Sequence, residues 1–170
     1  FEHTYFCTED IIEYWLKRYG FDVLERIYYD NDHSIFYATV YTEKLTDDPV
    51  PNLYETNHAL ALNYYAFHQD LIQRLNQVIT TTERPTYLFG AHVFSQFLLA
   101  FGLDSDRISC ILDNSTHKQN QRLYGTNLRV QSPKILTGTD KPLIIVRSGV
   151  FDAEIKAGIL KINPTAEFLS

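Results

Sequence analysis

The segment Tyr87-Leu88-Phe89-Gly90-Ala91-His92 decides the fold of this chain. Its three consecutive apolar residues are typical of a buried strand, and the glycine that follows permits a tight turn. From Val93 to Phe101 most residues are apolar, and Gly102 ends the run, which predicts a helix. A buried strand that turns directly into a helix is the opening unit of an α/β fold.

The same alternation of strand and helix continues to the end of the sequence. Four more strands and one more helix are predicted, the strands at 108–112, 128–130, 143–146 and 166–169 and the helix at 151–161. Strands joined by helices form a parallel sheet with helices on both faces. Residues 85–170 are therefore expected to form an α/β domain with a Rossmann-like parallel sheet and flanking helices.

The N-terminal part predicts a helix followed by two strands. Thr8 can cap a helix whose first turn is acidic and which ends at Gly20. The segments 21–29 and 34–42 are rich in β-branched and aromatic residues and flank the turn Asp30-Asn31-Asp32, which predicts a hairpin. One helix and two strands bury little apolar surface alone, so residues 1–43 are expected to complete a sheet begun upstream.

A linker and a long helix, residues 44–84, connect these two parts. The segment 45–51 contains two prolines and two acids, which indicates an extended linker. Asn52 can cap a helix over 52–80, with Glu55 at the capping-box position. Its predicted apolar stripe consists of Leu60, Tyr64, Phe67, Leu71, Leu75 and Val78.

Composition excludes several classes of partner. The chain has 170 residues and a net charge of −6, so neither nucleic acid nor an anionic membrane surface is an expected partner. No apolar run approaches the ~20 residues that span a bilayer, and a cytoplasmic location is expected. The sequence contains no methionine, and we expect it to be the C-terminal part of a longer protein.

Neither the cysteines nor the histidines suggest a metal site. Cys7 and Cys110 are too few for a disulfide framework or a four-thiolate zinc site, and both are expected to be reduced and in or near the core. The six histidines show no H-E-x-x-H or comparable spacing. No metal site is therefore expected within the chain.

The turn after the strand at 87–89 is the first candidate ligand site. Backbone N–H groups of Gly90 and Ala91, next to a helix start, can bind a phosphate or another anion, although a tight structural turn explains the same residues. The second and third glycines of a G-x-G-x-x-G fingerprint are missing, which disfavours a dinucleotide such as NAD. His92 and Ser95 can contact a ligand from the start of the helix.

Further candidates follow the strand at 108–112. Asp113 ends this strand, where α/β folds often place a carboxylate that binds a ribose hydroxyl, although a solvated loop acid is equally consistent with the sequence. Lys118 and Arg122 in the next loop can pair with a diphosphate, or can simply be exposed loop residues. The complete set of predicted substrate-binding residues is Gly90, Ala91, His92, Ser95, Asp113, Lys118 and Arg122.

A candidate catalytic pair lies at the very start of the sequence. Glu2 precedes His3, and a carboxylate beside an imidazole can tune a general base to near-neutral pH. No G-x-S-x-G elbow, P-loop or catalytic cysteine context occurs, which disfavours hydrolases and kinases.

Two stretches of the sequence resemble one family. Phe1-Glu2-His3-Thr4-Tyr5-Phe6, with the helix and hairpin that follow, is similar to the end of the S-adenosylmethionine-dependent domain of sugar-nucleotide C-methyltransferases. The second stretch resembles the C-terminal domain of the same family through several short motifs, namely Leu88-Phe89-Gly90-Ala91, Ile111-Leu112-Asp113-Asn114-Ser115, Lys118-Gln119, Arg122-Leu123-Tyr124-Gly125-Thr126, Ser132-Pro133 and the segment from Ile155 to Pro164. The order of the parts, including the long connecting helix, agrees with that family.

The resemblance implies an activity. Members of this family methylate a ring carbon next to a keto group on a nucleotide-linked deoxysugar, and zinc-binding and methyl-donor-binding domains precede these segments. Glu2 and His3 match the Glu-His of the family's Tyr-x-Glu-His motif, whose histidine is the proposed base. S-adenosylmethionine would be bound by the upstream domain, so no cofactor is expected on this chain, and the chain alone is expected to be inactive.

Two alternatives stay open. Gly-Ala after one strand and Asp-Asn after the next are also similar to the nucleotide-sugar-binding domain at the start of bacterial sugar acetyltransferases. The segment His92-Val93-Phe94-Ser95 departs from the smaller residues and the lysine that many methyltransferase members carry. The second functional hypothesis is therefore a non-catalytic nucleotide-sugar-binding or assembly module.

Overall fold

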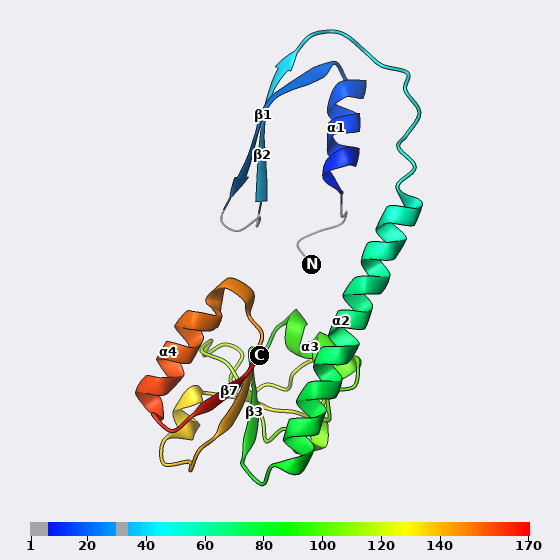
Figure 1. Ribbon diagram of the computed structural model, residues 1–170. Helices are drawn as coiled ribbons and strands as arrows, with labels where there is room; N and C mark the ends of the chain where they lie inside the picture. Colours follow the sequence, from blue (N-terminus) through cyan, green and yellow to red (C-terminus); the bar gives the residue numbers. More distant parts are fainter. Residues whose placement is uncertain (1–6, 30–33) are drawn as a thin grey trace. The chain divides into compact units, whose positions relative to one another are not determined.

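The computed structural model describes residues 7–29 and 34–170 (Figure 1). The chain separates into two compact units, residues 1–59 and residues 60–170. Glu2 and His3, the predicted catalytic pair, lie outside the described residues. Among the helices that the structure describes, none is long and apolar enough to cross a membrane.

The first unit is the predicted helix and hairpin. Helix α1 (Glu9–Arg18) is followed by strands β1 (Phe21–Tyr29) and β2 (Ser34–Tyr41), which pair antiparallel in a two-stranded sheet. Thr8 precedes the helix as predicted, but its side chain makes no capping hydrogen bond. Cys7 is exposed, which corrects its predicted place in or near the core.

Arg26 on β1 ties the hairpin to α1. Its Nη1 donates to Oε2 of Glu9 at 2.8 Å, and its Nη2 lies 2.6 Å from Oε1 of Glu13. The hydroxyl of Tyr28 also donates to Glu9, at 2.6 Å, and this hydrogen bond is the main cause that lowers the pKa of Glu9. All four side chains are partly solvated, so the network orients the helix more than it stabilises the unit.

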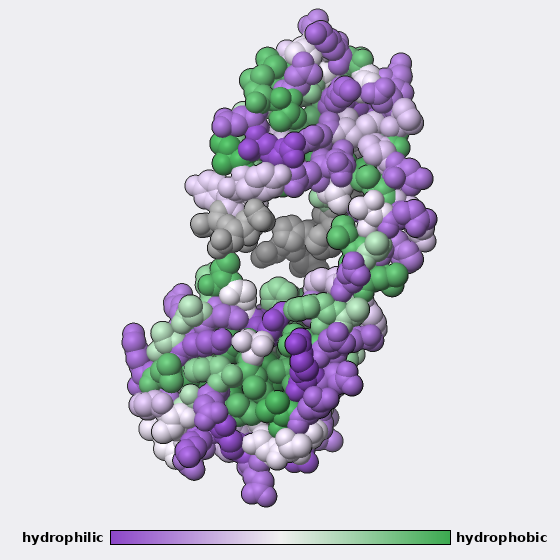
Figure 2. All heavy atoms as spheres, viewed as in Figure 1, coloured by the Kyte–Doolittle hydropathy of each residue, from purple (hydrophilic) through white to green (hydrophobic). Residues whose placement is uncertain are grey.

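The opposite face of the hairpin is apolar and exposed. Ile27 pairs with Phe36 across the strands, and Val40 lies further along the same face of β2. Figure 2 shows hydrophobic residues along the hairpin on the side away from α1. Within the described part of this unit, nothing covers that face.

The long helix α2 (Tyr54–Thr81) is confirmed, but its buried face differs from the predicted stripe. Oδ1 of Asn52 accepts from the N–H of Tyr54 at 3.2 Å, as expected for a residue that caps the helix start. The buried residues of α2 all lie in its C-terminal half, namely His68, Leu71, Ile72, Leu75 and Ile79. Leu71 and Leu75 of the predicted stripe are buried, as expected. Leu60, Tyr64 and Phe67 are exposed because only the second half of α2 packs on a sheet, and Val78 is exposed although it lies in that half.

The second unit contains the predicted parallel sheet. Its strands are β3 (Thr86–Phe89), β4 (Ile111–Leu112), β5 (Val130–Gln131), β6 (Leu143–Val146) and β7 (Glu167–Leu169), in the order β5-β4-β3-β6-β7, and every neighbouring pair is parallel. Strand β4 is shorter than the predicted 108–112. The reason is that Ile108 closes the short helix η1 (Ser105–Arg107), with its N–H donating to the carbonyl of Ser105 at 3.1 Å.

Helices cover both faces of this sheet, as predicted, and side chains alternate between the faces along each strand. Leu88, Ile111 and Ile145 point into a core with α2 and α3 (Val93–Ala100). Phe89 and Ile144 belong to a second core with the short helix η2 (Pro133–Leu136) and α4 (Asp152–Ile162). In Figure 1, α2 and α3 lie on one side of β3 and α4 on the other.

The strand order fixes where the sheet opens. From β3 the chain adds β4 and β5 on one side, and then crosses back through η2 to place β6 on the other side of β3. The short helix η3 (Gly149–Phe151) and α4 then connect β6 to β7 at the edge of the sheet. The connections leave β3 and β6 in opposite directions, and this reversal is where open α/β sheets typically bind their ligands. The turns after β3, β4 and β6 therefore meet at one edge of the sheet.

Candidate functional site

The turn after β3 is held by two backbone hydrogen bonds to the end of β4. Gly90 has φ +100°, and its N–H donates to the carbonyl of Leu112 at 2.7 Å. The N–H of Ala91 donates to Oδ2 of Asp113 at 2.7 Å. The sequence predicted that the N–H of Ala91 could bind an external anion. In the structure this N–H donates instead to a carboxylate of the chain itself.

Asp113 joins the two turns. It is only 7% exposed, and its Oδ1 accepts from the N–H of Ser115 at 2.8 Å. The ammonium group of Lys118 lies 3.3 Å from Oδ2 on the solvent side. The structure thus brings together five of the predicted residues, Gly90, Ala91, His92, Asp113 and Lys118.

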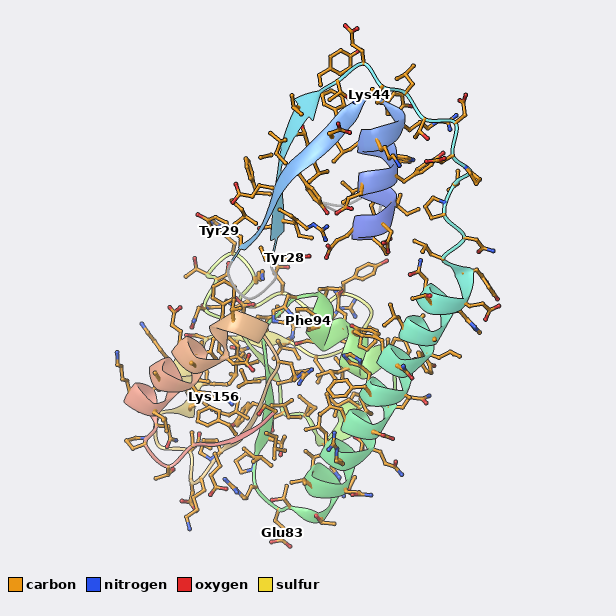
Figure 3. All side chains as sticks on the ribbon, turned by 45° about the horizontal axis from the view of Figure 1, so that its top comes forward. Tyr28, Tyr29, Lys44, Glu83, Phe94 and Lys156 are labelled. Atoms are coloured by element: carbon orange, nitrogen blue, oxygen red, sulfur yellow. The ribbon has the colours of Figure 1, made fainter. Side chains whose placement is uncertain are left out.

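The imidazole of His92 lies over Gly90 in one defined tautomer. A methyl group on Gly90 would collide with this ring. Nδ1 of His92 accepts from the N–H of Phe94 at 3.2 Å, so in the neutral ring the proton is on Nε2. Nε2 lies 3.2 Å from Oγ of Ser148 and therefore donates to it. Phe94, labelled in Figure 3, marks the start of α3 beside this site.

The surroundings of His92 favour its neutral form. Burial lowers the pKa of the imidazole, the positive charge of Lys118 lowers it further, and Asp113 and Asp152 oppose these effects. The ring is therefore uncharged at neutral pH. This protonation state agrees with the hydrogen bond that Nδ1 accepts.

Ser148 is a site residue that the sequence reasoning missed. It follows β6, whose carboxyl end lies beside that of β3, and its N–H donates to Oδ1 of Asp152 at 2.5 Å. The available signal was its position two residues after the apolar run Leu143-Ile144-Ile145-Val146. A polar residue just beyond a buried parallel strand is placed at the ligand-binding edge of the sheet.

The arrangement supplies hydrogen-bond donors and no activated nucleophile. Because Nε2 of His92 carries the proton, it cannot accept one from the hydroxyl of Ser148. The hydroxyl of Ser148 accepts from His92 and keeps its own hydrogen for an external acceptor. Together with the ammonium of Lys118, it makes the edge suited to an oxyanion such as a phosphate oxygen.

The other predicted residues lie elsewhere. Ser95 is buried, and its hydroxyl donates to the carbonyl of Phe89 at 3.4 Å, beneath the turn. Arg122 lies in the segment that precedes β5, where it forms a β-bridge with Arg129 and its Nη1 is 3.5 Å from Oδ1 of Asn127. No contact between Arg122 and the Asp113 cluster is found among residues 7–29 and 34–170.

The ring of His92 occupies the space above Gly90, so a ligand cannot approach the backbone closely at this point of the strand-turn-helix unit. For metals, no group of three or more His, Cys, Asp or Glu side chains is close enough to hold an ion in the part of the chain that the structure describes.

Two comparisons, with protein-family models and with curated proteins, found no match. The function of the second unit is therefore inferred from its geometry.

The contact between Gly90 and His92 gives a test of this geometry. Gly90→Ala and Gly102→Ala both place a side chain at positive φ, which costs about 1–2 kcal/mol. Only at Gly90 does the new methyl group meet a neighbouring side chain. Urea unfolding is expected to show Gly90→Ala destabilised by roughly 1–3 kcal/mol more than Gly102→Ala. Adding His92→Ala should recover most of the difference, and equal losses at the two glycines would contradict the geometry.

The pKa of His92 predicts a dependence of stability on pH. The folded pKa is below the unfolded value of about 6.5, so the unfolded chain binds the proton first as the pH falls. The contribution of His92 to stability is thus complete above about pH 6.5 and is lost below it. His92→Gln is expected to reduce this acid-side loss in urea unfolding curves, whereas the matched change at the exposed His117 should leave it intact. An unchanged pH profile in His92→Gln would contradict the assignment.

Proposed function

We propose that residues 86–170 bind the diphosphate of a nucleotide-linked sugar at the carboxyl ends of β3, β4 and β6. The observation that carries the proposal is the donor cluster at this edge. The ammonium of Lys118 and the hydroxyl of Ser148 are both available there, on turns that Asp113 and His92 hold in place. A charged donor beside a neutral one suits phosphate oxygens.

The topology supports this location. The order β5-β4-β3-β6-β7 corresponds to the first five strands of the 3-2-1-4-5-6 order of a Rossmann fold, and ligands of such folds bind where the strand order reverses. A full dinucleotide is not proposed, since His92 fills the space that a second glycine would leave open.

We further propose that this domain belongs to an S-adenosylmethionine-dependent C-methyltransferase acting on a nucleotide-linked keto-deoxysugar. A helix followed by an antiparallel hairpin with an uncovered apolar face suits the end of a larger sheet. In this proposal, His3 takes the proton from the sugar carbon next to the ketone, and Glu2 orients the imidazole. The methyl donor is held by an upstream domain, and the C-terminal domain supports the sugar nucleotide.

One observation favours a second candidate function. The N–H of Ala91 is bound by Asp113, and the N–H of Phe94 is bound by His92, so two donors near the start of α3 are used internally. A domain that has satisfied these groups itself can serve as a non-catalytic assembly module. Nucleotide binding distinguishes the two functions.

Calorimetric titration of the chain with dTDP, UDP, GDP and CDP tests the proposal. Binding of at least one nucleoside diphosphate is expected, with S-adenosylhomocysteine as a ligand that does not bind. Lys118→Gln should weaken the interaction about tenfold, because a charge-assisted hydrogen bond to phosphate is lost.

Lys134→Gln is the matched control, since this lysine is exposed in the same unit and lies on η2. Its affinity should equal that of the unchanged chain. Failure of all four nucleotides to bind would favour the assembly module. The methyltransferase assignment would be overturned if the coding region upstream of Phe1 encoded no glycine-rich methyl-donor loop.

A further inference from the structure

A hollow separate from the Asp113 cluster lies between α3 and the segment that leads into β5. Its volume is about 620 Å³, within the range of small-molecule sites. The lining comes from α3, from η1 and from the loop before β5, and consists of Gln96, Leu99, Ala100, Ser105, Asp106, Tyr124, Gly125, Thr126, Asn127 and Leu128. None of the residues that contact Asp113 belongs to this lining.

The floor of the hollow is apolar and anchored to the core. Leu99 and Leu128 pack against the cluster between the sheet and α2. The carbonyl of Leu128 also accepts a hydrogen bond of 2.9 Å from the N–H of Leu123, which holds the backbone at Leu128. The floor of the hollow is therefore continuous with the core of the second unit.

One wall carries an aromatic ring with no partner in the described part of the chain. Tyr124 is 87% exposed, and neither a ring contact nor a hydrogen bond of its hydroxyl is found there. The residue directly precedes the Gly125 turn, at which φ is +77°. A tyrosine ring held beside an apolar floor is a surface on which a flat apolar face can stack.

The remaining walls are polar but contain no cation. Gln96, Ser105 and Asn127 offer amide and hydroxyl groups that both donate and accept, and Asp106 adds a carboxylate. Arg122 lines an adjoining hollow that shares Gly125, Thr126 and Asn127 with this one, and its Nη1 lies 3.5 Å from Oδ1 of Asn127. On the lining itself the single charged side chain is the carboxylate of Asp106, which disfavours a phosphate there.

We propose that this hollow binds a neutral pyranose, independently of the diphosphate site. A pyranose has one face of C–H groups, which stacks on Tyr124, and hydroxyls that both donate and accept. Gln96 pairs with such hydroxyls in both senses, Asn127 donates to them through its amide NH2 group while its Oδ1 faces Arg122, and Asp106 accepts from them. The combination of an aromatic platform, amides, a carboxylate and no cation matches an uncharged sugar better than a nucleotide.

Saturation-transfer NMR with methyl glycosides of glucose, galactose, mannose, rhamnose and N-acetylglucosamine tests this site. At least one glycoside is expected to show transfer to its ring C–H protons. Tyr124→Ala should weaken binding about tenfold or more, because the stacking surface is lost, and Asn127→Ala should weaken it less.

Tyr19→Ala is the matched control, because this tyrosine is also exposed but lies in the first unit. It should leave the transfer unchanged, and the thermal midpoint of Tyr124→Ala should match that of the unchanged chain.

The proposal is overturned if no glycoside shows transfer, or if the transfer persists in both Tyr124→Ala and Asn127→Ala. It is also overturned if UDP binds in the same way and loses affinity in Tyr124→Ala, since a nucleoside would then be the ligand. Lys118→Gln should not change glycoside binding, which separates this test from that of the diphosphate site.

Discussion

The carboxylate of Asp113 is the group on which the edge of the second unit depends. It accepts from the N–H of Ala91 after β3 and from the N–H of Ser115 after β4. Without it, the N–H of Ala91 would lose its partner beside a buried strand, at a cost of roughly 1–3 kcal/mol. Because the bond fixes Ala91, it also fixes Gly90 at positive φ and the ring of His92 above it. Ser148, which follows β6, is then held through the same ring.

A different constraint governs the first unit. Arg26 and Tyr28 bind the carboxylate of Glu9, and Arg26 also binds that of Glu13, so α1 lies on one face of the hairpin. The ion pairs are partly solvated and contribute little to stability, so the apolar residues must supply most of it. Yet Ile27, Phe36 and Val40 remain exposed on the other face. The hydrogen bonds and ion pairs therefore define the geometry of the unit, but the unit buries little apolar surface. This is the physical reason for the proposal that it completes a larger sheet.

The elements were predictable where a buried pattern repeats locally. Leu143-Ile144-Ile145-Val146 is apolar on both faces, and the structure makes it a central strand between β3 and β7. The short β4 was overestimated, since Ile108 has strand propensity but closes η1. In α2, the sequence period identified Leu71 and Leu75 but not the rest of the buried face, because exposed aromatics such as Tyr64 and Phe67 count as apolar in the pattern while His68 is buried among rings.

The site was predictable only in part, for a similar reason. The sequence located Gly90 and Asp113 from their positions after strands, but their direct link depends on the pairing of β3 with β4. Ser148 lies 56 residues from His92, and no local pattern joins them. The roles of hydrogen-bond donors also depend on the tautomer of His92, which only the position of Phe94 N–H decides.

The donor arrangement explains how the edge can accept an anion without being rebuilt. The carboxylate of Asp113 accepts from three donors. Two of them are the backbone N–H groups that hold the turns. Lys118 is the third, at the longest distance of the three and with its side chain about half exposed. In the proposed function, this partly solvated ammonium contacts a phosphate while the N–H groups of Ala91 and Ser115 keep the buried carboxylate of Asp113 in place. Neutral His92 adds no competing charge. The residue proposed to meet the phosphate is thus separate from the residues that hold the fold.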